Sequence, residues 1–225
     1  MEMQPWESVP GAFLCPGDVY FLETGRKKML RKENNRLHWI VKTGLLAAVA
    51  FVLMYIEFPL PIAPPWLKLD ISDFPALLAG FALGPVSGCV VEAIKVVLFF
   101  FLKNSGTGGV GELANLLMGL AFVLPSAWIY LKHKNFKGAI VGTLIGVAAM
   151  AVAGGALNYW LLIPAYSKFM PIEAIIAACQ AINPAVDSVL GYVLVMAVPF
   201  TLLKGLLDGV LVFLVYKKIS PLLHK

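Results

Sequence analysis

The chain has 225 residues and a formal net charge of +5; 60% of its residues are hydrophobic, 14% are charged, and the mean hydropathy is +0.82. Soluble domains average about a quarter charged residues, so this composition excludes an ordinary soluble domain and indicates an integral membrane protein. Repeated apolar runs of about twenty residues predict membrane helices, because lipid cannot hydrogen-bond an exposed backbone. We expect one helical bundle with no room for a soluble ATPase domain, and the sequence has no Gly-rich phosphate-binding loop.

The composition of reactive residues predicts no metal site and no enzyme activity. The three cysteines lack metal-ligand spacing, and the three histidines lie in basic segments beside predicted helix ends. No serine or cysteine stands near a plausible base in the sequence. We therefore predict no catalytic residue, no metal ligand and no cofactor.

Residues 1–36 mix proline, glycine and charge, and they end in a basic run at 26–36. An apolar core followed by a small-residue cleavage site is missing, so this segment does not resemble a secretory signal. We expect a polar, partly disordered cytoplasmic extension, followed by a membrane domain at 37–218 and a cytoplasmic tail at 219–225.

The first apolar segment runs from about residue 39 to 58 and contains Gly44 and Ala48, four positions apart. Small residues at this interval let another helix approach closely. That helix belongs either to the same bundle or to another subunit, and the pair alone does not distinguish these alternatives.

A proline-rich connection at 57–75 follows the first segment. Its five prolines fix backbone angles and remove N–H donors, which stiffens the loop. Trp66 adds an aromatic face, and neighbouring residues add charge. A stiff, aromatic, charged loop at a membrane surface is suited to closing over a small ligand. Its candidate ligand-binding residues are Leu67, Lys68, Asp70 and Phe74.

Two short helices are predicted next, at about 73–83 and 85–103, because Gly84-Pro85 interrupts the apolar run. Glu92 and Lys95 are three residues apart and share one helical face, so we interpret them as an internal ion pair. A flexible Gly-rich loop at 103–111 follows and contains Thr107.

The fourth segment, about 112–131, carries Glu112 and Asn115 in its first turn. The fifth segment, about 138–163, is rich in Gly and Ala and ends near Asn158 and Tyr159. Residues 164–187 are predicted to form a longer connection, with a short surface helix at 171–182. The sixth segment, about 188–216, places Thr201, Lys204 and Asp208 on one stripe.

Basic clusters orient the six segments. If both termini are cytoplasmic, the clusters at 26–36, 132–137 and 217–225 all lie on the cytoplasmic side, as the excess of Lys and Arg in cytoplasmic loops requires. The proline-rich loop, the Gly-rich loop and the 164–187 connection then face outward. The predicted fold is a compact all-α bundle of six transmembrane helices with a binding pocket open to the outside.

Polar residues inside the predicted membrane segments are the strongest candidates for function. A membrane lysine costs several kcal/mol unless it meets a cavity or a partner. Lys204 therefore either contacts a ligand or pairs with Asp208 or Glu112. The Asn158 amide suits a heterocycle with adjacent carbonyl and N–H groups, although an interhelical hydrogen bond is an alternative. Tyr159 is either a stacking residue or an interfacial anchor.

Several motifs together resemble one transporter family. The sequence at 57–61, 67–77, 80–85, 111–115 and 199–205 resembles the riboflavin-specific substrate-binding subunit, or S component, of energy-coupling factor (ECF) transporters. The resemblance covers about 39–218. It implies a multi-pass, six-helix subunit of a prokaryotic cell membrane that binds riboflavin with high affinity on its outer face for ATP-driven uptake. Riboflavin is then the transported ligand, and no nucleic acid is involved.

The resemblance also implies protein partners, namely a transmembrane coupling subunit and two cytoplasmic ATPase subunits, besides membrane lipid. In this family a small-xxx-small motif on the first helix docks the coupling subunit, usually through alanines. Here the expected docking residues are Gly44, Ala47 and Ala48, with Gly in place of the first Ala. The last helix typically reads Pro-Phe-Asn, and Thr201 replaces that Asn, which leaves the hydrogen bonding around Lys204 open.

Riboflavin has a flat ring with one apolar and one polar edge, and a hydroxylated tail. We expect segments one and two and the proline-rich loop to pack the apolar edge, and Asn158 and Lys204 to meet the polar edge. Glu112, Asn115 and Thr107 are candidates for the tail. The complete set of expected ligand-binding residues is Leu67, Lys68, Asp70, Phe74, Thr107, Glu112, Asn115, Asn158, Tyr159, Thr201 and Lys204.

Two alternative functions remain open from the sequence. An S component for another vitamin would share the fold and differ in the pocket. An autonomous ion-coupled transporter would use Glu92, Glu112, Lys204 and Asp208 as a relay, although such proteins commonly contain internal repeats and no convincing repeat is visible here.

Overall fold

The computed structural model describes residues 16–103, 108–168 and 170–223. The chain forms two units, residues 1–41 and 42–225. In chain order the elements are α1 (Pro16–Tyr55), β1 (Phe58–Pro59), β2 (Lys68–Leu69), α2 (Asp73–Leu83), α3 (Pro85–Leu102), α4 (Val110–Lys132), α5 (Phe136–Leu157), η1 (Asn158–Leu162), α6 (Ile163–Tyr166), α7 (Ile172–Gln180), α8 (Val189–Tyr192), η2 (Val193–Ala197) and α9 (Val198–Leu223).

The first unit contains the start of α1 and differs from the sequence prediction. Residues 16–36, expected in a partly disordered extension, are helical. Pro16 suits the first turn of a helix, where no intrahelical bond requires its missing N–H. The Leu, Met, Lys, Arg and Glu residues that follow are good helix formers, so a high density of charge is compatible with a helix here.

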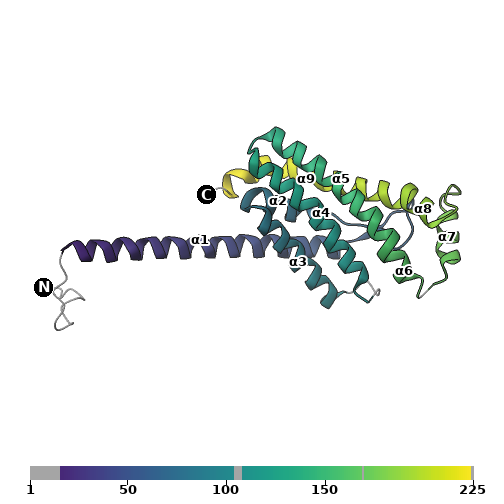
Figure 1. Cartoon of the computed structure of the whole chain (residues 1–225), viewed down its shortest axis with the longest axis horizontal. Helices are drawn as coiled ribbons and strands as arrows, with labels where there is room; N and C mark the ends of the chain where they lie inside the picture. The colour runs from purple at the N-terminus through teal and green to yellow at the C-terminus, as the bar shows by residue number, and fades with distance from the viewer. Residues whose placement is uncertain (1–15, 104–107, 169, 224–225) are drawn as a thin grey trace. The chain divides into compact units, whose positions relative to one another are not determined.

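The predicted helical membrane protein is present in the structure. Five helical stretches of the described chain are long and apolar enough to cross a membrane, and α3, α4 and α5 lie side by side (Figure 1). These stretches are Arg36–Tyr55, Pro85–Leu102, Val110–Lys132, Phe136–Tyr166 and Val189–Val215. The remaining one of the six predicted helices is α2, the second in chain order. It has 11 residues and is about 16 Å long, roughly half the thickness of the hydrocarbon core.

The break between α2 and α3 occurs where the sequence predicts it. Gly84 adopts a φ of 105°, which favours glycine, and Pro85 then begins α3. The two helices pack closely because Gly88 has no side chain. A Cβ at Gly88 would lie 2.5 Å from Val123 Cγ1 and 2.9 Å from the Ala76 carbonyl oxygen.

Two wide, π-type turns interrupt the fifth and sixth segments. They span Asn158–Leu162 and Val193–Ala197, and each is followed by a proline, Pro164 or Pro199. A proline inside an α-helix removes one backbone hydrogen bond and clashes with the carbonyl four residues earlier. That carbonyl belongs to a wide turn in both helices, which accommodates the proline.

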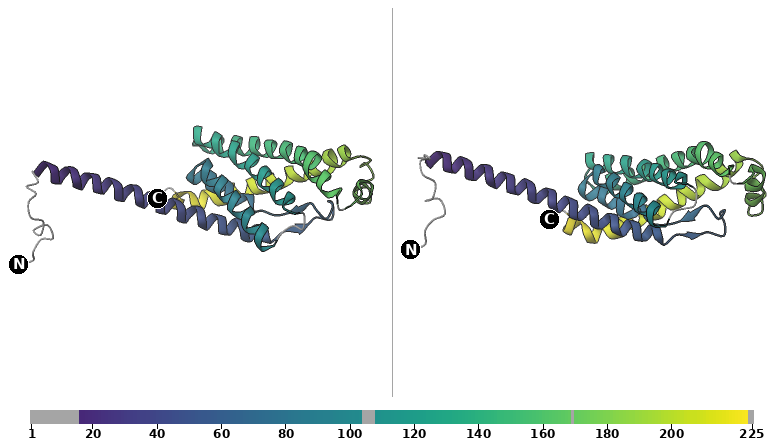
Figure 2. Two further views of the ribbon diagram at one scale, coloured as in Figure 1. Left: turned by 60° about the horizontal axis from the view of Figure 1, so that its bottom comes forward. Right: turned by 90° about the horizontal axis from the view of Figure 1, so that it is seen from below.

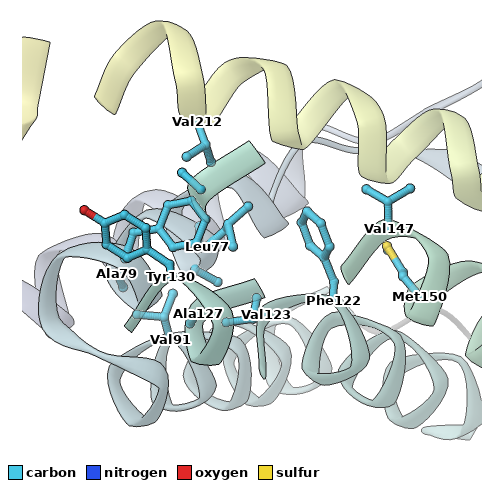
Figure 3. Close-up of a cluster of buried hydrophobic side chains, with 14 of the residues drawn as sticks. Leu77, Ala79, Val91, Phe122, Val123, Ala127, Tyr130, Val147, Met150 and Val212 are labelled. Carbon is cyan, nitrogen blue, oxygen red and sulfur yellow. The ribbon is translucent and has the colours of Figure 1, made fainter. Parts of the chain in front are cut away.

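The apolar core of the second unit joins five helices around the short α2. Figure 3 shows Leu77 of α2, Val91 of α3, Phe122 and Val123 of α4, and Val147 of α5 pointing into one cluster. Further members of the cluster come from α9 and from the buried side of α1. Because α2 is buried among its neighbours, its short length does not expose it to lipid.

The proline-rich connection and α7 lie toward the same end of the second unit (Figure 2). The connection forms a hairpin in which β1 and β2 pair antiparallel, with Phe58 opposite Leu69 and Pro59 opposite Lys68. The short helix predicted at 171–182 is confirmed as α7. The proline-rich connection and the connection that contains α7 both contribute residues to the wall of one cavity.

Candidate ligand-binding cavity

A cavity of about 320 Å³ lies between the hairpin, α7 and the ends of the long helices. This volume is within the range of about 300–1,000 Å³ that is typical of small-molecule sites. The residues that line it are Met54, Glu57, Trp66, Leu67, Lys68, Asp70, Phe99, Gly111, Glu112, Asn115, Met118, Met150, Asn158, Leu162, Tyr166, Met170, Ile175, Phe200, Thr201 and Lys204.

Much of the lining is methionine and aromatic. Met54, Met118 and Met150 come from three different helices, and their flexible side chains adapt to the shape of a ligand. Trp66 of the hairpin packs against Tyr166 of α6 with ring centroids 6.4 Å apart. This part of the cavity offers flat, polarisable surfaces to an apolar or aromatic ligand.

An ion pair between α9 and the proline-rich loop forms one polar wall. Lys204 Nζ lies 2.9 Å from Asp70 Oδ2 and 3.3 Å from Asp73 Oδ2. Asp70 is held in turn by Ser72, whose backbone N–H and hydroxyl both donate to Asp70 Oδ1, at 3.0 and 2.5 Å. The loop therefore fixes the position of the lysine that faces the cavity.

The partner of Lys204 differs from both partners that the sequence suggested. Asp208, four residues on, instead accepts a hydrogen bond from the backbone N–H of Phe74 at 3.2 Å. The first N–H groups of a helix lack intrahelical acceptors, so a carboxylate at the start of α2 satisfies one of them. Glu112 lines the cavity, and Lys204 pairs with Asp70 and Asp73.

A second buried ion pair continues the network behind the cavity. Lys95 of α3 is fully buried and contacts Asp73, Glu92 and the Ser72 hydroxyl, with 2.8 Å to Glu92 Oε2 and 3.0 Å to Ser72 Oγ. The predicted internal pair of Glu92 and Lys95 is thereby confirmed. Asp73 contacts both lysines, so it joins the cavity lysine to the interior pair.

A hydrogen-bond relay fixes the amide of Asn158 at another wall. Trp66 Nε1 donates to the Tyr192 hydroxyl at 3.1 Å, and this hydroxyl donates to Asn158 Oδ1 at 2.9 Å. Asn158 Nδ2 donates to the Gly154 carbonyl at 2.8 Å. Asn158 thus makes an interhelical bond and lines the cavity, so the two roles suggested by the sequence are compatible.

Comparison with known proteins identifies the family. Residues 38–216 match the model of a family described as "ECF transporter, substrate-specific component". The chain belongs to this family. A substrate-specific component is a transport subunit and not an enzyme, and the resemblance seen in the sequence motifs is confirmed.

Individual relatives of this S component support the assignment. It is 38% identical to riboflavin transporter FmnP of Bacillus subtilis over 81% of this chain and 92% of that protein. It is 34% identical to riboflavin transporter RibU of Staphylococcus aureus, over 89% of this chain and 98% of that protein. A solved structure described as "Structure and mechanism of the S component of a bacterial ECF transporter" aligns with a TM-score of 0.66 and 32% identity, covering 86% of this chain and 99% of that chain.

The S component brings most of its sequence-predicted ligand residues to this one cavity. Those that line it are Leu67, Lys68, Asp70, Glu112, Asn115, Asn158, Thr201 and Lys204. Phe74 instead packs against the core cluster, and Tyr159 lies on the outside with 42% of its surface exposed. Thr107 lies outside the residues that the structure describes.

Several lining residues of the S component had no distinctive signal in the sequence. Phe99, Met118 and Met150 occur in apolar helices, where core packing explains a large apolar residue equally well. Glu57 had a weak signal as a charged residue at the start of the proline-rich loop. It pairs with Lys68 across the hairpin at 2.6 Å and with Lys103, at the end of α3, at 3.0 Å.

Proposed function

We propose that this S component binds riboflavin with high affinity in the cavity and supplies it for ATP-driven uptake across a bacterial membrane. The observation that carries the proposal is that the cavity has both polar and apolar walls. An amide and an ammonium group lie in its polar walls, while methionine and aromatic side chains form much of the rest. The names of the relatives from B. subtilis and S. aureus support the same ligand.

The polar edge of the riboflavin ring carries carbonyl and N–H groups, which match Asn158 and Lys204. A lysine ammonium has three N–H donors. Asp70 Oδ2 accepts one of them at 2.9 Å, while Asp73 Oδ2 lies 3.3 Å away as an ion-pair partner without a hydrogen bond. Lys204 therefore keeps N–H donors for a ligand carbonyl. The two carboxylates balance the charge of the ammonium group, which suits recognition of a polar but uncharged ring.

The hydroxylated tail requires further hydrogen-bonding groups, and Glu112 and Asn115 are proposed for this role. The buried Asn115 Oδ1 has no hydrogen-bond partner within the described residues, although buried polar atoms are usually paired. A ligand hydroxyl would satisfy it. Thr107 remains a proposed tail contact, while Thr201 already donates to the Ala197 carbonyl at 2.8 Å and offers a ligand only an acceptor.

The proposed topology has six membrane helices, both termini in the cytoplasm and the cavity open to the outside. The basic clusters in the sequence support this orientation. The short α2 is compatible with a place among the six, because surrounding helices bury most of its residues. A helix shielded by protein is not required to match the hydrocarbon thickness.

Docking of the coupling subunit is proposed on the exposed side of α1, the side that faces away from the core cluster. Gly44 and Ala48 are exposed, and a Cβ at Gly44 would meet nothing within 4 Å. Ala47 is 1% exposed and belongs to the core cluster, so it would support the docking face from behind. Small exposed residues let a partner helix approach closely.

The proposal is tested with the protein purified in detergent, by titrating riboflavin and following the quenching of its fluorescence. We expect saturable binding that Lys204→Ala and Asn158→Ala each weaken by at least tenfold, because each variant removes a buried group that pairs with the ring. Lys134→Ala, at an exposed lysine outside the cavity, is the matched control and retains the wild-type affinity. Failure of the wild-type protein to quench riboflavin would sink the proposal, and another vitamin would then be titrated.

A further inference from the structure

We propose that Tyr192 is a positioning residue for the bound ligand, because its hydroxyl holds the Asn158 amide in one orientation. The inference rests on the proposed riboflavin site, in which Asn158 is a polar contact. Tyr192 is not among the described residues that line the cavity, so it acts through its neighbour. The relay begins at Trp66, which ties the orientation of the amide to the proline-rich loop.

The contacts of the relay come from three separate parts of the chain. Trp66 lies between β1 and β2, Tyr192 ends α8, and Asn158 begins η1. The Trp66 and Tyr192 rings also pack edge to face, with centroids 6.3 Å apart. Tyr192 and Asn158 are each 1% exposed, so water does not compete for their hydrogen bond.

The direction of each hydrogen bond follows from the groups at the two ends. An indole N–H is only a donor, so the Tyr192 oxygen accepts from Trp66 and its proton is available to Asn158 Oδ1. The Gly154 carbonyl is only an acceptor, so it requires the amide nitrogen of Asn158. A reversed amide would place two oxygen atoms against each other at Gly154.

This arrangement leaves a defined part of the amide for the ligand. One of the two Asn158 N–H groups and one oxygen lone pair are occupied, so one donor and one acceptor remain. A ligand edge with an adjacent carbonyl and N–H group uses both. Loss of the Tyr192 hydroxyl would remove one of the two anchors and allow the amide to turn away from this geometry.

The experiment is a double-mutant cycle of Tyr192→Phe and Asn158→Ala in the purified full chain, with riboflavin affinity measured by fluorescence quenching. We expect Tyr192→Phe to weaken binding about tenfold in the wild-type background, as for one well-placed hydrogen bond, and less than twofold in the Asn158→Ala background. Tyr166→Phe is the control, since the Tyr166 hydroxyl is not part of the relay and the phenylalanine ring keeps the packing against Trp66 at the cavity wall. Its effect is expected to be equal in both backgrounds.

Two results would overturn the inference: no loss of affinity in Tyr192→Phe, or the same loss in both backgrounds. Thermal unfolding of the same four proteins without riboflavin separates this question from the proposed function. If wild-type protein does not bind riboflavin, a smaller drop in the midpoint for Tyr192→Phe in the Asn158→Ala background still supports the relay and overturns only the ligand. Equal drops in both backgrounds overturn the relay itself.

Discussion

Lys204 of α9 and Asp70 of the proline-rich loop form a buried ion pair, with 2.9 Å between Nζ and Oδ2, although 134 positions separate them in the chain. The loop is therefore a structural part of the cavity wall. The affinity for a ligand that hydrogen-bonds to Lys204 therefore depends on the position of this loop, because Ser72 fixes the Asp70 carboxylate that pairs with the lysine.

Asp70→Asn tests this relationship. The substitution keeps the shape of the side chain and removes the charge that orients Lys204, so we expect riboflavin affinity to fall about tenfold. Fluorescence quenching provides the measurement. Glu173→Gln, on an exposed position of α7, makes the same chemical change outside the cavity and is expected to leave the affinity unchanged. Equal affinities of Asp70→Asn and wild type would mean that Lys204 needs no loop carboxylate.

Lys95→Met tests the interior pair. The variant leaves Asp73 and Glu92 without the ammonium group that they share, and breaking a buried pair in this way costs about 3–5 kcal/mol of unfolding free energy. For a chain of this size the midpoint of thermal unfolding in detergent should fall by roughly 6–20 °C. Lys134→Met is the surface control. A midpoint within a degree of the control would show that the pair contributes little to stability.

Gly88→Ala and Gly44→Ala make the same change in two different surroundings. The new methyl group at Gly88 would contact Val123 and the backbone of Ala76 too closely, and overpacking of this kind costs about 1–3 kcal/mol. At Gly44 nothing lies within 4 Å, so alanine should be neutral or slightly stabilising within the helix. Thermal unfolding of both variants distinguishes these effects, and similar midpoints would contradict the tight packing of α2 against α3.

Ala48→Leu tests the proposed docking face on α1. The larger side chain projects from an exposed position, so the isolated subunit should keep its wild-type affinity for riboflavin while co-purification with the coupling subunit falls several-fold. Val152→Leu adds bulk at an exposed site on α5 and is the control. Undiminished co-purification of Ala48→Leu would place the docking face elsewhere.

The sequence was most informative where a local pattern has a local structural cause. Gly84-Pro85 marked the boundary between α2 and α3, because a positive φ followed by a proline ends one helix and begins the next. The i, i+3 spacing of Glu92 and Lys95 correctly predicted their contact. Intramembrane polarity led to Asn158 and Lys204, since lipid does not tolerate such groups without a partner.

Contacts between distant segments were beyond this local reasoning. Helical spacing favoured Asp208 as the partner of Lys204, but nothing local indicates that the start of α2 requires the Asp208 carboxylate. The relay from Trp66 to Tyr192 joins residues 126 positions apart. The lining methionines carry no periodic signal that differs from ordinary core packing, so only the folded chain brings them to the cavity.

The two wide turns in the fifth and sixth segments determine which side chains of the residues after them face the cavity. Each residue advances an α-helix by about 100°, so removing one residue from the Asn158–Leu162 turn would rotate all later side chains of that helix. Leu162 and Tyr166 would then leave the wall together, whatever their chemistry. A change of helix length at this end of the bundle would therefore disturb several residues of the cavity wall at once, whereas a substitution changes only one of them.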